Sequence, residues 1–397
     1  MKILFLASYF PNRVRFAGPF IKNHARVAGR VAEVSVLTID RDDSAHMKPY
    51  ELVYTLEEGL PTVRVYYRHR CLNLPLLRSL IRFSRFFRGL RAGYRMLREK
   101  SGHFDLVHLN VVEQTGLFAL WLSLTRGLPY VVTEHSSVYV PEDFRRQSRF
   151  KRLFHRICLR RAREISVVSR YLQNCLRELN LAERCRVVPN VVDTRRFFPG
   201  EPRPPGGRAR LLHVSNLKPL KGVEQILRTL PLLTAAGRDT ELHILGESEE
   251  YEKELRGLSG DLGLGERVFF HGQQPAEAVA ARMRESHMLV LNSAFETFGV
   301  VITEALACGI PVVAPATGAI PEQLQEGRGF LLRERSAEAI CSAICHVLDH
   351  YADYDPQVLR RYVQAHFSEE AVEQAFRALY ASALTPPAQE GTHQISN

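Results

Sequence analysis

Short apolar runs alternate with longer amphipathic segments along almost the whole chain. The apolar runs have the composition of buried strands, and the segments between them repeat apolar residues at helical spacing. This alternation predicts parallel β-α-β units. We expect strands at residues 2–7, 33–38, 106–109, 130–133, 164–168, 187–188, 210–214, 241–245, 268–271, 288–291 and 311–314. We expect helices at residues 20–31, 221–236, 249–262, 276–285, 300–308, 337–351, 357–366 and 369–384.

A Pro/Gly-rich segment at residues 198–207 separates two halves that show the same alternation. Such a segment is typical of a linker between domains. The expected fold class is therefore α/β, with two Rossmann-like, doubly wound parallel-sheet domains facing a central cleft. We place an N-terminal domain at 1–198 and a C-terminal domain at 199–365. A helix at 366–385 is expected to pack back toward the N-terminal domain, and residues 386–397 to form a flexible tail.

Two glutamates, Glu296 and Glu304, flank the pair Phe298-Gly299 in the second half. The apolar run before Glu296 predicts a buried strand, and residues 300–308 predict a helix. Phe298-Gly299 therefore falls near a helix N-terminus, where free backbone N–H groups and the helix dipole favour an anion such as a phosphate. A carboxylate on each side can accept hydrogen bonds from hydroxyl groups. The set suits a nucleotide sugar, although the spacing alone also fits two ordinary helix-start acids.

The charge is divided unevenly between the halves. Residues 1–200 carry a net charge of +18 and residues 201–397 carry −8, which together give the +10 of the whole chain. Such asymmetry predicts that the N-terminal half meets a polyanion. A nucleic-acid partner is not expected, because the chain contains no recognised nucleic-acid-binding motif.

Basic side chains gather in two stretches, residues 64–100 with eleven Lys and Arg and residues 145–163 with nine. Within residues 72–97 they alternate with Leu, Ile and Phe, which is typical of a basic amphipathic helix on a bilayer surface. The alternative is a solvated basic face whose apolar side packs on the sheet. The first interpretation predicts docking on an anionic membrane surface.

The compartment follows from what the chain lacks. No apolar run approaches the roughly 18 to 20 residues that span a bilayer. The first eight residues run into Tyr9-Phe10-Pro11-Asn12 without a small-residue cleavage site, so they are interpreted as a strand and not as a signal peptide. Seven cysteines without a C-x-x-C pair fit a reducing cytosol. We expect a cytoplasmic protein that attaches peripherally to the inner face of the cell membrane.

With the glutamate pair placed in the second of two such domains, the chain resembles the retaining glycosyltransferases of the GT-B fold. More closely, it resembles family 4, often called the group 1 glycosyltransferases. The resemblance implies that Glu296 contacts hydroxyls of the transferred sugar and that Glu304 binds the nucleotide ribose. It also implies that backbone N–H groups around Phe298, Gly299 and Val300 meet the phosphate or the sugar.

Two motifs of the N-terminal half match the same family. The loop Arg15-Phe-Ala-Gly-Pro-Phe20 follows the first predicted strand, and the resemblance implies that Gly18 lets its backbone approach the donor phosphates. The alternative is a plain turn glycine. His135 lies just past a predicted strand, in Val131-Val-Thr-Glu-His-Ser-Ser137. The resemblance implies that it contacts the donor sugar or nearby acceptor groups.

A third motif is Val214-Ser-Asn-Leu-Lys-Pro-Leu-Lys-Gly222, which contains the Lys-Gly pair of the family at Lys221-Gly222. In the family the basic pair of this motif holds the donor diphosphate. Asn216 stands where arginine is usual, and an amide does not supply the missing charge, for which Lys218 is a candidate substitute. A lysine at a helix start opposes the dipole, which favours a functional role for Lys221. The residues that we expect to act in catalysis are Glu296, His135 and Lys221.

The resemblance also implies a reaction and its partners. The donor would be a nucleotide diphosphate sugar, and the N-terminal domain would face a lipid-linked or saccharide acceptor. Transfer would retain the anomeric configuration by front-face attack, with a donor phosphate oxygen taking up the acceptor proton, so no protein base is nominated. Neither a cofactor nor a metal ion is expected. The implied setting is bacterial cell-surface polysaccharide, lipopolysaccharide or glycolipid synthesis.

Three other functions compete with this hypothesis. A nucleotide-sugar epimerase on the same fold would bind the same donor without needing an acceptor. A nicotinamide oxidoreductase would also suit two Rossmann-like domains, but the first strand-helix turn has no G-x-G-x-x-G. The unusual Asn216 leaves room for a non-catalytic protein that only binds a nucleotide sugar.

Overall fold

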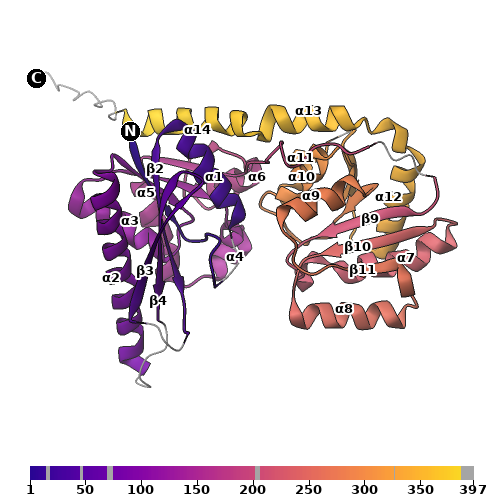
Figure 1. The fold of residues 1–397 in the computed structure, drawn as a ribbon, viewed down its shortest axis with the longest axis horizontal. Coiled ribbons are helices and arrows are strands. Elements are labelled where there is room, and N and C mark those ends of the chain that lie inside the picture. The colour runs from indigo at the N-terminus through magenta and orange to yellow at the C-terminus, as the bar shows by residue number, and fades with distance from the viewer. Residues whose placement is uncertain (15–17, 45–47, 69–74, 202–205, 326, 386–397) are drawn as a thin grey trace, which may run out of the picture.

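The computed structural model describes residues 1–14, 18–44, 48–68, 75–201, 206–325 and 327–385 of the chain. They form two α/β units, each built on one largely or wholly parallel sheet with helices packed around it (Figure 1). The predicted fold class is confirmed. The predicted flexible tail and the start of the Gly18 loop lie outside the described residues.

The N-terminal sheet has eight strands in the order β3-β4-β2-β1-β5-β6-β7-β8. Neighbouring strands are parallel except for the hairpin of β3 and β4, which is antiparallel. Register places Ile3 of β1 beside Val34 of β2 on one side and Leu106 of β5 on the other. The strands are β1 (Lys2–Ala7), β2 (Glu33–Arg41), β3 (Tyr50–Glu57), β4 (Leu60–Tyr67), β5 (Leu106–Asn110), β6 (Tyr130–Glu134), β7 (Glu164–Val167) and β8 (Arg186–Val187).

Six α-helices and one short 3-10 helix accompany this sheet. They are α1 (Pro19–Val31), α2 (Pro75–Ser101), α3 (Gln114–Arg126), η1 (Ser137–Tyr139), α4 (Pro141–Arg146), α5 (Arg149–Arg161) and α6 (Arg170–Glu178) within the described part of residues 1–200.

The C-terminal sheet has six parallel strands in the order β11-β10-β9-β12-β13-β14. Its strands are β9 (Ala209–Val214), β10 (Thr240–Leu245), β11 (Val268–Phe270), β12 (Met288–Val290), β13 (Val312–Pro315) and β14 (Gly329–Leu332). The helices are η2 (Pro219–Lys221), α7 (Val223–Ala235), α8 (Glu249–Asp261), η3 (Gly265–Arg267), α9 (Ala276–Arg284), α10 (Val300–Ala307), α11 (Ile320–Gln323), α12 (Ala337–Asp349), η4 (Tyr351–Asp353), α13 (Pro356–Phe367) and α14 (Glu369–Leu384).

Each predicted strand is confirmed with small shifts at its ends, but three strands were missed. The β3–β4 hairpin turns at Glu58 and Gly59, which both have positive φ values of 50° and 84°. The strands of this hairpin are mostly half-buried and contain charged residues. They therefore lack the continuous apolar run by which the other strands were predicted. The strand β14 is only four residues long and follows a short glycine-rich stretch. The predicted helix start at residue 221 was wrong, because Lys221 lies in η2 and α7 begins at Val223.

The helix α2 shows which side of the basic segment is buried. Phe86, Leu90 and Leu97 are buried against β2 and β4, so much of the apolar face packs on the sheet. Nearer its start, Leu80 and Phe83 remain 67% and 50% exposed. Among the described residues, none of the helices combines the length and apolar character that crossing a bilayer requires.

The two last helices run across the molecule from one unit to the other (Figure 1). Helix α13 packs on α10 of the C-terminal unit, and α14 packs on α1 of the N-terminal unit. Between them, the hydroxyl of Ser368 accepts a hydrogen bond from the N–H of Ala371 and so caps α14. The Tyr380 hydroxyl of α14 lies 2.7 Å from His108 Nδ1 on β5. The last helix is thus part of the N-terminal core.

Candidate functional site

A cavity of about 850 Å³ lies between the carboxyl ends of the two sheets. One wall comes from the loops after β1, β5 and β6, and the other from the loops after β9 and β12. The strand order reverses between β1 and β5 and between β9 and β12, and ligands of open α/β sheets bind at such switch points. The wall contains five of the predicted site residues: Gly18, His135, Asn216, Lys221 and Glu296.

An ion pair joins two of the predicted catalytic residues. Lys221 Nζ donates a hydrogen bond to Glu296 Oε1 at 2.6 Å, and the side chains are only 16% and 17% exposed. Such a pair attracts more strongly here than it would in bulk water, because water screens it less. An ammonium group suits a phosphate and a carboxylate suits sugar hydroxyls. The pair therefore brings both types of ligand group to one place.

Three helices begin with an uncapped first turn near the cleft. Gly18, Gly222 and Gly299 are the N-cap residues of α1, α7 and α10, and no side chain caps these helices. At Gly18 φ is 75°, and an added β-carbon would lie 2.7 Å from the carbonyl oxygen of Tyr9. At Gly222 φ is 62°, and an added β-carbon would lie 2.7 Å from that of Asn292. Both positions require glycine. The N–H groups of Val223 and Glu224 after Gly222 are suited to an anion, whereas Pro19 after Gly18 has no N–H and leaves Phe20 as the first donor of α1.

The loop after β9 places two polar side chains on the same wall. Asn216 and Lys218 both line the cavity and are exposed. The Lys218 ammonium forms no hydrogen bond or ion pair with the described residues, whereas the Lys221 ammonium is held by Glu296. Lys218 therefore brings a positive charge to the wall on which Asn216 stands where the family resemblance led us to expect an arginine.

The ring of His135 forms part of the opposite wall. It packs between the rings of Phe20 and His24, with centroid distances of 5.1 Å to each. The side chain of Asn190 also interacts with the ring and partly offsets the effect of burial on its pKa. Burial, with smaller contributions from His24 and His108, holds the pKa of His135 well below its usual value. The cleft wall thus carries a neutral imidazole, which can donate or accept a hydrogen bond.

The other predicted site residues lie beside the cavity and not on its wall. Glu304 lies half-buried on α10, and the burial of its carboxyl group raises its pKa to about 8, against an opposing effect of Arg196. Phe298 is buried against α13. Gly299 and Val300 form the start of α10. Gly222 lies directly after Lys221 and is the N-cap residue of α7. The roles proposed for these residues stay predictions.

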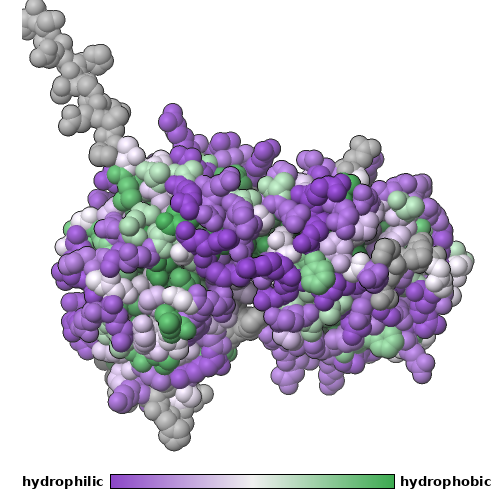
Figure 2. Space-filling view, turned by 45° about the horizontal axis from the view of Figure 1, so that its top comes forward, coloured by the Kyte–Doolittle hydropathy of each residue, from purple (hydrophilic) through white to green (hydrophobic). Residues whose placement is uncertain are grey.

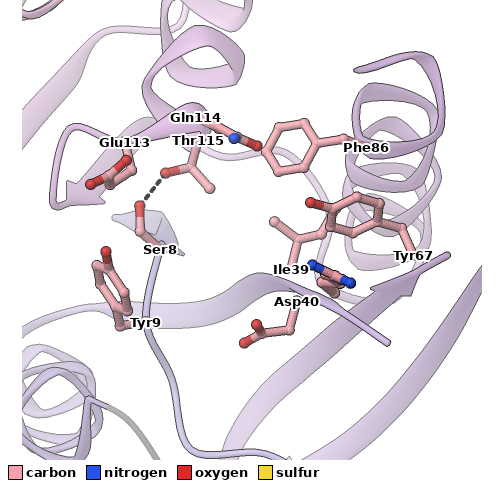
Figure 3. Close-up of a pocket in the computed structure, with 10 residues that line it drawn as sticks. Ser8, Tyr9, Ile39, Asp40, Tyr67, Phe86, Glu113, Gln114 and Thr115 are labelled. Carbon is pink, nitrogen blue, oxygen red and sulfur yellow. Dashed lines mark hydrogen bonds between the residues drawn. The ribbon is translucent and has the colours of Figure 1, made fainter. Parts of the chain in front are cut away.

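A second cavity, of about 230 Å³, opens at the carboxyl edge of the N-terminal sheet (Figure 3). Tyr9 lines both cavities, so the two adjoin. The sequence analysis missed it, because its wall comes from separate segments that follow or adjoin four strands and α2. The lining residues are Ser8, Tyr9, Ile39, Asp40, Arg41, Tyr67, Phe86, Glu113, Gln114 and Thr115.

Sequence reasoning also missed polar residues of the cleft and a contact between the units. Ser136, Ser137, Glu142 and Asp143 line the large cavity, and their place in the segment that follows His135 was the available signal. Glu322 of the C-terminal unit accepts hydrogen bonds from the N–H groups of Arg170 and Tyr171 at 2.9 and 2.5 Å, and so caps α6 of the N-terminal unit. No local pattern predicts that contact.

Two family models match successive parts of the chain. Residues 24–196 match "Glycosyltransferase Family 4", and residues 194–363 match "Glycosyl transferases group 1". The matches meet at the segment that joins the two units, and together they cover nearly all of both sheets.

Curated relatives of the chain include two mycobacterial mannosyltransferases. A GDP-mannose-dependent alpha-(1-6)-phosphatidylinositol monomannoside mannosyltransferase of Mycolicibacterium smegmatis is 32% identical over 41% of this chain and 46% of its own length. An MMP alpha-(1->4)-mannosyltransferase of Mycolicibacterium hassiacum is 29% identical over 59% of this chain and 58% of its own. The chain thus spans about half the length of these relatives.

Solved structures resemble the whole molecule. The sucrose-phosphate synthase of Thermosynechococcus elongatus has a TM-score of 0.75 at 21% identity, covering 96% of this chain and all of that one. HepE of Anabaena, in complex with UDP and glucose, has a TM-score of 0.70 at 18% identity, over 96% of this chain and all of that one. The fold is therefore that of GT-B proteins, and the chain belongs to the group 1 glycosyltransferases of family 4.

Proposed function

We propose that this chain transfers a sugar from a nucleotide diphosphate sugar to an acceptor hydroxyl with retention of the anomeric configuration. The proposed setting is the synthesis of a bacterial cell-surface polysaccharide, lipopolysaccharide or glycolipid, on the cytoplasmic side of the membrane. Some relatives are named after their sugar donor or their acceptor. They support sugar transfer as the class of reaction, but they do not identify the substrates of this chain. The epimerase alternative has no support among the relatives reported above.

The Lys221–Glu296 pair carries this proposal. Its ammonium and carboxylate lie on the cavity wall that faces the N-terminal unit, with the uncapped start of α7 next to Lys221. A nucleotide sugar would exchange this pair for two new partners, since the diphosphate takes the ammonium and the sugar hydroxyls take the carboxylate. Glu304, on the same helix that Gly299 begins, is the candidate for the ribose hydroxyls.

The proposed transfer breaks the bond between the anomeric carbon and the diphosphate oxygen. The acceptor oxygen forms its bond to the same carbon on the same face, and its proton passes to a phosphate oxygen of the leaving diphosphate. Lys221, Lys218 and the N–H groups at the start of α7 stabilise the charge that develops on that group. His135 and the Gly18 loop lie on the opposite wall and hold the reacting groups in place. No cofactor and no metal ion has a role in this scheme.

The second cavity is the proposed place for the acceptor. It adjoins the cleft at Tyr9, and its wall combines hydroxyl, carboxylate and amide groups with the rings of Tyr67 and Phe86 (Figure 3). Such a mixture provides hydrogen bonds to hydroxyl groups beside an apolar surface. A sugar unit of a saccharide or glycolipid acceptor has both kinds of surface.

Exposed apolar side chains support docking of the N-terminal unit on an anionic membrane. Phe150, Leu153 and Ile157 of α5 are 81%, 54% and 39% exposed, and their spacing puts them on one helical face. Arg and Lys residues of α5 flank them, as they flank Leu80 and Phe83 of α2. Figure 2 shows more hydrophobic surface on the N-terminal lobe than on the C-terminal lobe of the same face. Insertion of such side chains between basic ones is typical of interfacial helices.

Thermal shift against a panel of UDP-, GDP-, ADP- and CMP-sugars, each beside its free nucleotide, tests the proposed function. A ligand that binds only the folded protein raises its melting temperature, by an amount that grows with ligand concentration. We expect one nucleotide series to raise it, and Lys221→Ala to reduce the shift. Lys253→Ala, an exposed lysine of α8, is the matched control. A panel in which no nucleotide sugar shifts the wild-type protein contradicts the proposal.

A further inference from the structure

A three-residue loop after β5 forms part of the wall between the two cavities. Val111 lines the large cavity in the cleft, and Glu113 lines the smaller cavity of the N-terminal unit. Figure 3 shows Glu113 near Tyr9, the residue that lines both. The course of residues 111–113 therefore fixes the shape of both cavities at the point where they adjoin.

The backbone of this loop is strained at its first residue. Val111 has a φ of 67°, in the left-handed region, where a β-branched side chain is a rare and unfavourable occupant. Three hydrogen bonds hold the loop there. The Ser8 hydroxyl donates to the Val111 carbonyl at 2.9 Å, the Val111 N–H donates to the Thr133 carbonyl at 3.0 Å, and the Val112 N–H donates to Glu134 Oε1 at 2.6 Å.

Glu134 is the ionisable partner in this set, and it is fully buried at the end of β6. Its Oε1 also accepts a hydrogen bond from the Tyr139 hydroxyl at 3.0 Å, and that hydroxyl lies 2.7 Å from His155 Nδ1. The backbone N–H of His135 also interacts with this carboxyl group. Taking an acid out of water is costly even where it is hydrogen-bonded, so a fully buried Glu134 calls for a reason other than stability.

We propose that Glu134 is a positioning residue for sugar transfer. It holds the strained 111–113 loop in the course that lets a donor in the large cavity and an acceptor in the second cavity meet for reaction. The same carboxyl ties η1, which follows His135, to the loop through Tyr139. One side chain thus links both polypeptide segments that flank the cavity wall. The assignment of reacting groups to the two cavities rests on the proposed function, whereas the clamp on the loop does not.

Titration of Glu134 should make the hold on the 111–113 loop depend on pH. Burial raises the pKa of Glu134 to about 7, against the opposing bonds from Val112 and Tyr139. The side chains that face it are Tyr139 of η1, His155 and Cys158 of α5, and Glu113 of the loop. Burial lowers the pKa of His155 to about 4 and raises those of Tyr139 and Cys158, the second to about 12. An ionised Glu134 accepts the Val112 hydrogen bond more strongly, so the clamp tightens as the pH rises through about 7.

The experiment compares Glu134→Ala, Glu134→Gln and Val111→Gly with the wild type and with Glu183→Gln, an exposed acid of the same unit. Amide hydrogen exchange of residues 111–113 reports the clamp. Release of nucleoside diphosphate reports transfer, with the nucleotide sugar that the thermal-shift panel selects and a panel of methyl glycosides as acceptors. We expect Glu134→Ala to lose protection at Val112 and to lower kcat/KM about 10- to 100-fold. Glu134→Gln keeps an acceptor oxygen, so it should retain protection.

Two readouts separate positioning from a merely structural role. The rise of kcat/KM between pH 6 and 8 should be clearly smaller in Glu134→Gln than in the wild type, because only the contribution of Glu304, with a pKa of about 8, then remains. Glycine tolerates the left-handed backbone without strain, so the loss caused by Glu134→Ala should be several-fold smaller in a Val111→Gly background. Additive losses, or a rise of kcat/KM with pH that is equal in Glu134→Gln and in the wild type, would overturn the proposal. If no nucleotide sugar stabilises the wild type, the proposed function fails, while unchanged exchange at residues 111–113 in Glu134→Ala would separately refute the clamp.

Discussion

The two units share one architecture but differ in where their chemistry resides. In the C-terminal unit, the cleft residues lie in two short segments, one around Lys221 and one around Glu296, that follow adjacent strands of a regular parallel sheet. In the N-terminal unit, the corresponding wall is assembled from four or more segments and includes a strained residue, Val111, whose neighbour Val112 is hydrogen-bonded to the buried acid Glu134. The N-terminal sheet also carries the added β3–β4 hairpin and the long helix α2.

This difference fits two different binding tasks. A diphosphate needs amide N–H groups and a cation, which one helix start and one lysine provide within a short segment. An acceptor is recognised by its shape and hydroxyls, and that requires surfaces from several directions. The comparison predicts that single substitutions in the C-terminal unit act on donor binding and chemistry, whereas those in the N-terminal unit act on acceptor use and location.

The largest effect is expected from Glu296→Ala. It removes the carboxylate proposed to hold the sugar and frees Lys221 from its ion pair, so kcat should fall about 100- to 1,000-fold. Steady-state release of nucleoside diphosphate measures this, with Glu266→Ala, an exposed acid of η3, as the control. An activity within threefold of the wild type would remove Glu296 from the mechanism.

Lys221→Ala should weaken donor binding about 10- to 100-fold, because a hydrogen bond between charged groups is lost. Titration calorimetry with the selected nucleotide diphosphate gives the dissociation constant, and Lys253→Ala is again the control.

Asn216→Arg sharpens the same comparison. It adds a cation to the wall that Lys218 already lines, so donor binding should tighten several-fold. Unchanged affinity in Asn216→Arg would mean that the diphosphate does not reach the loop after β9.

Membrane binding should respond to substitutions in the N-terminal unit. Phe150→Asp with Leu153→Asp replaces two exposed apolar side chains of α5 with acids, and co-sedimentation with anionic liposomes should fall about tenfold or more. Val358→Asp, which changes an exposed apolar residue of α13, should leave liposome binding unchanged. Equal and negligible binding of the wild-type protein to anionic and neutral liposomes contradicts the membrane proposal.

A smaller effect is expected at Glu304. Burial raises its pKa to about 8, above the usual value of about 4.3 for the unfolded chain. The neutral form is favoured in the folded protein, so its contribution to stability is complete below about pH 4 and is lost as the pH rises through about 8. Glu304→Gln should therefore raise the melting temperature, relative to the wild type, by a few degrees more at pH 8.5 than at pH 5. Scanning calorimetry at the two pH values measures this, and an equal difference at both would refute the raised pKa.

The sequence predicted what local patterns encode. The family resemblance placed Lys221 and Gly18 at the donor site. Both follow apolar runs that form central strands, and the carboxyl ends of parallel strands meet at one edge. The role of Glu134 was not predicted, since its partners Val112, Tyr139 and His155 come from three segments. The second cavity was missed for the same reason.

Helix α14 has a consequence for the order in which the chain folds during synthesis. Its residues Phe376, Leu379 and Tyr380 are buried in the core formed with β1, β2 and α1, although they leave the ribosome after the entire C-terminal unit. Until then, the imidazole of His108 lacks its Tyr380 partner and the groove along α1 stays open. The first unit to be synthesised is thus the last to be completed, and a chain that stops before residue 369 would carry an unfinished N-terminal core, open to aggregation or proteolysis.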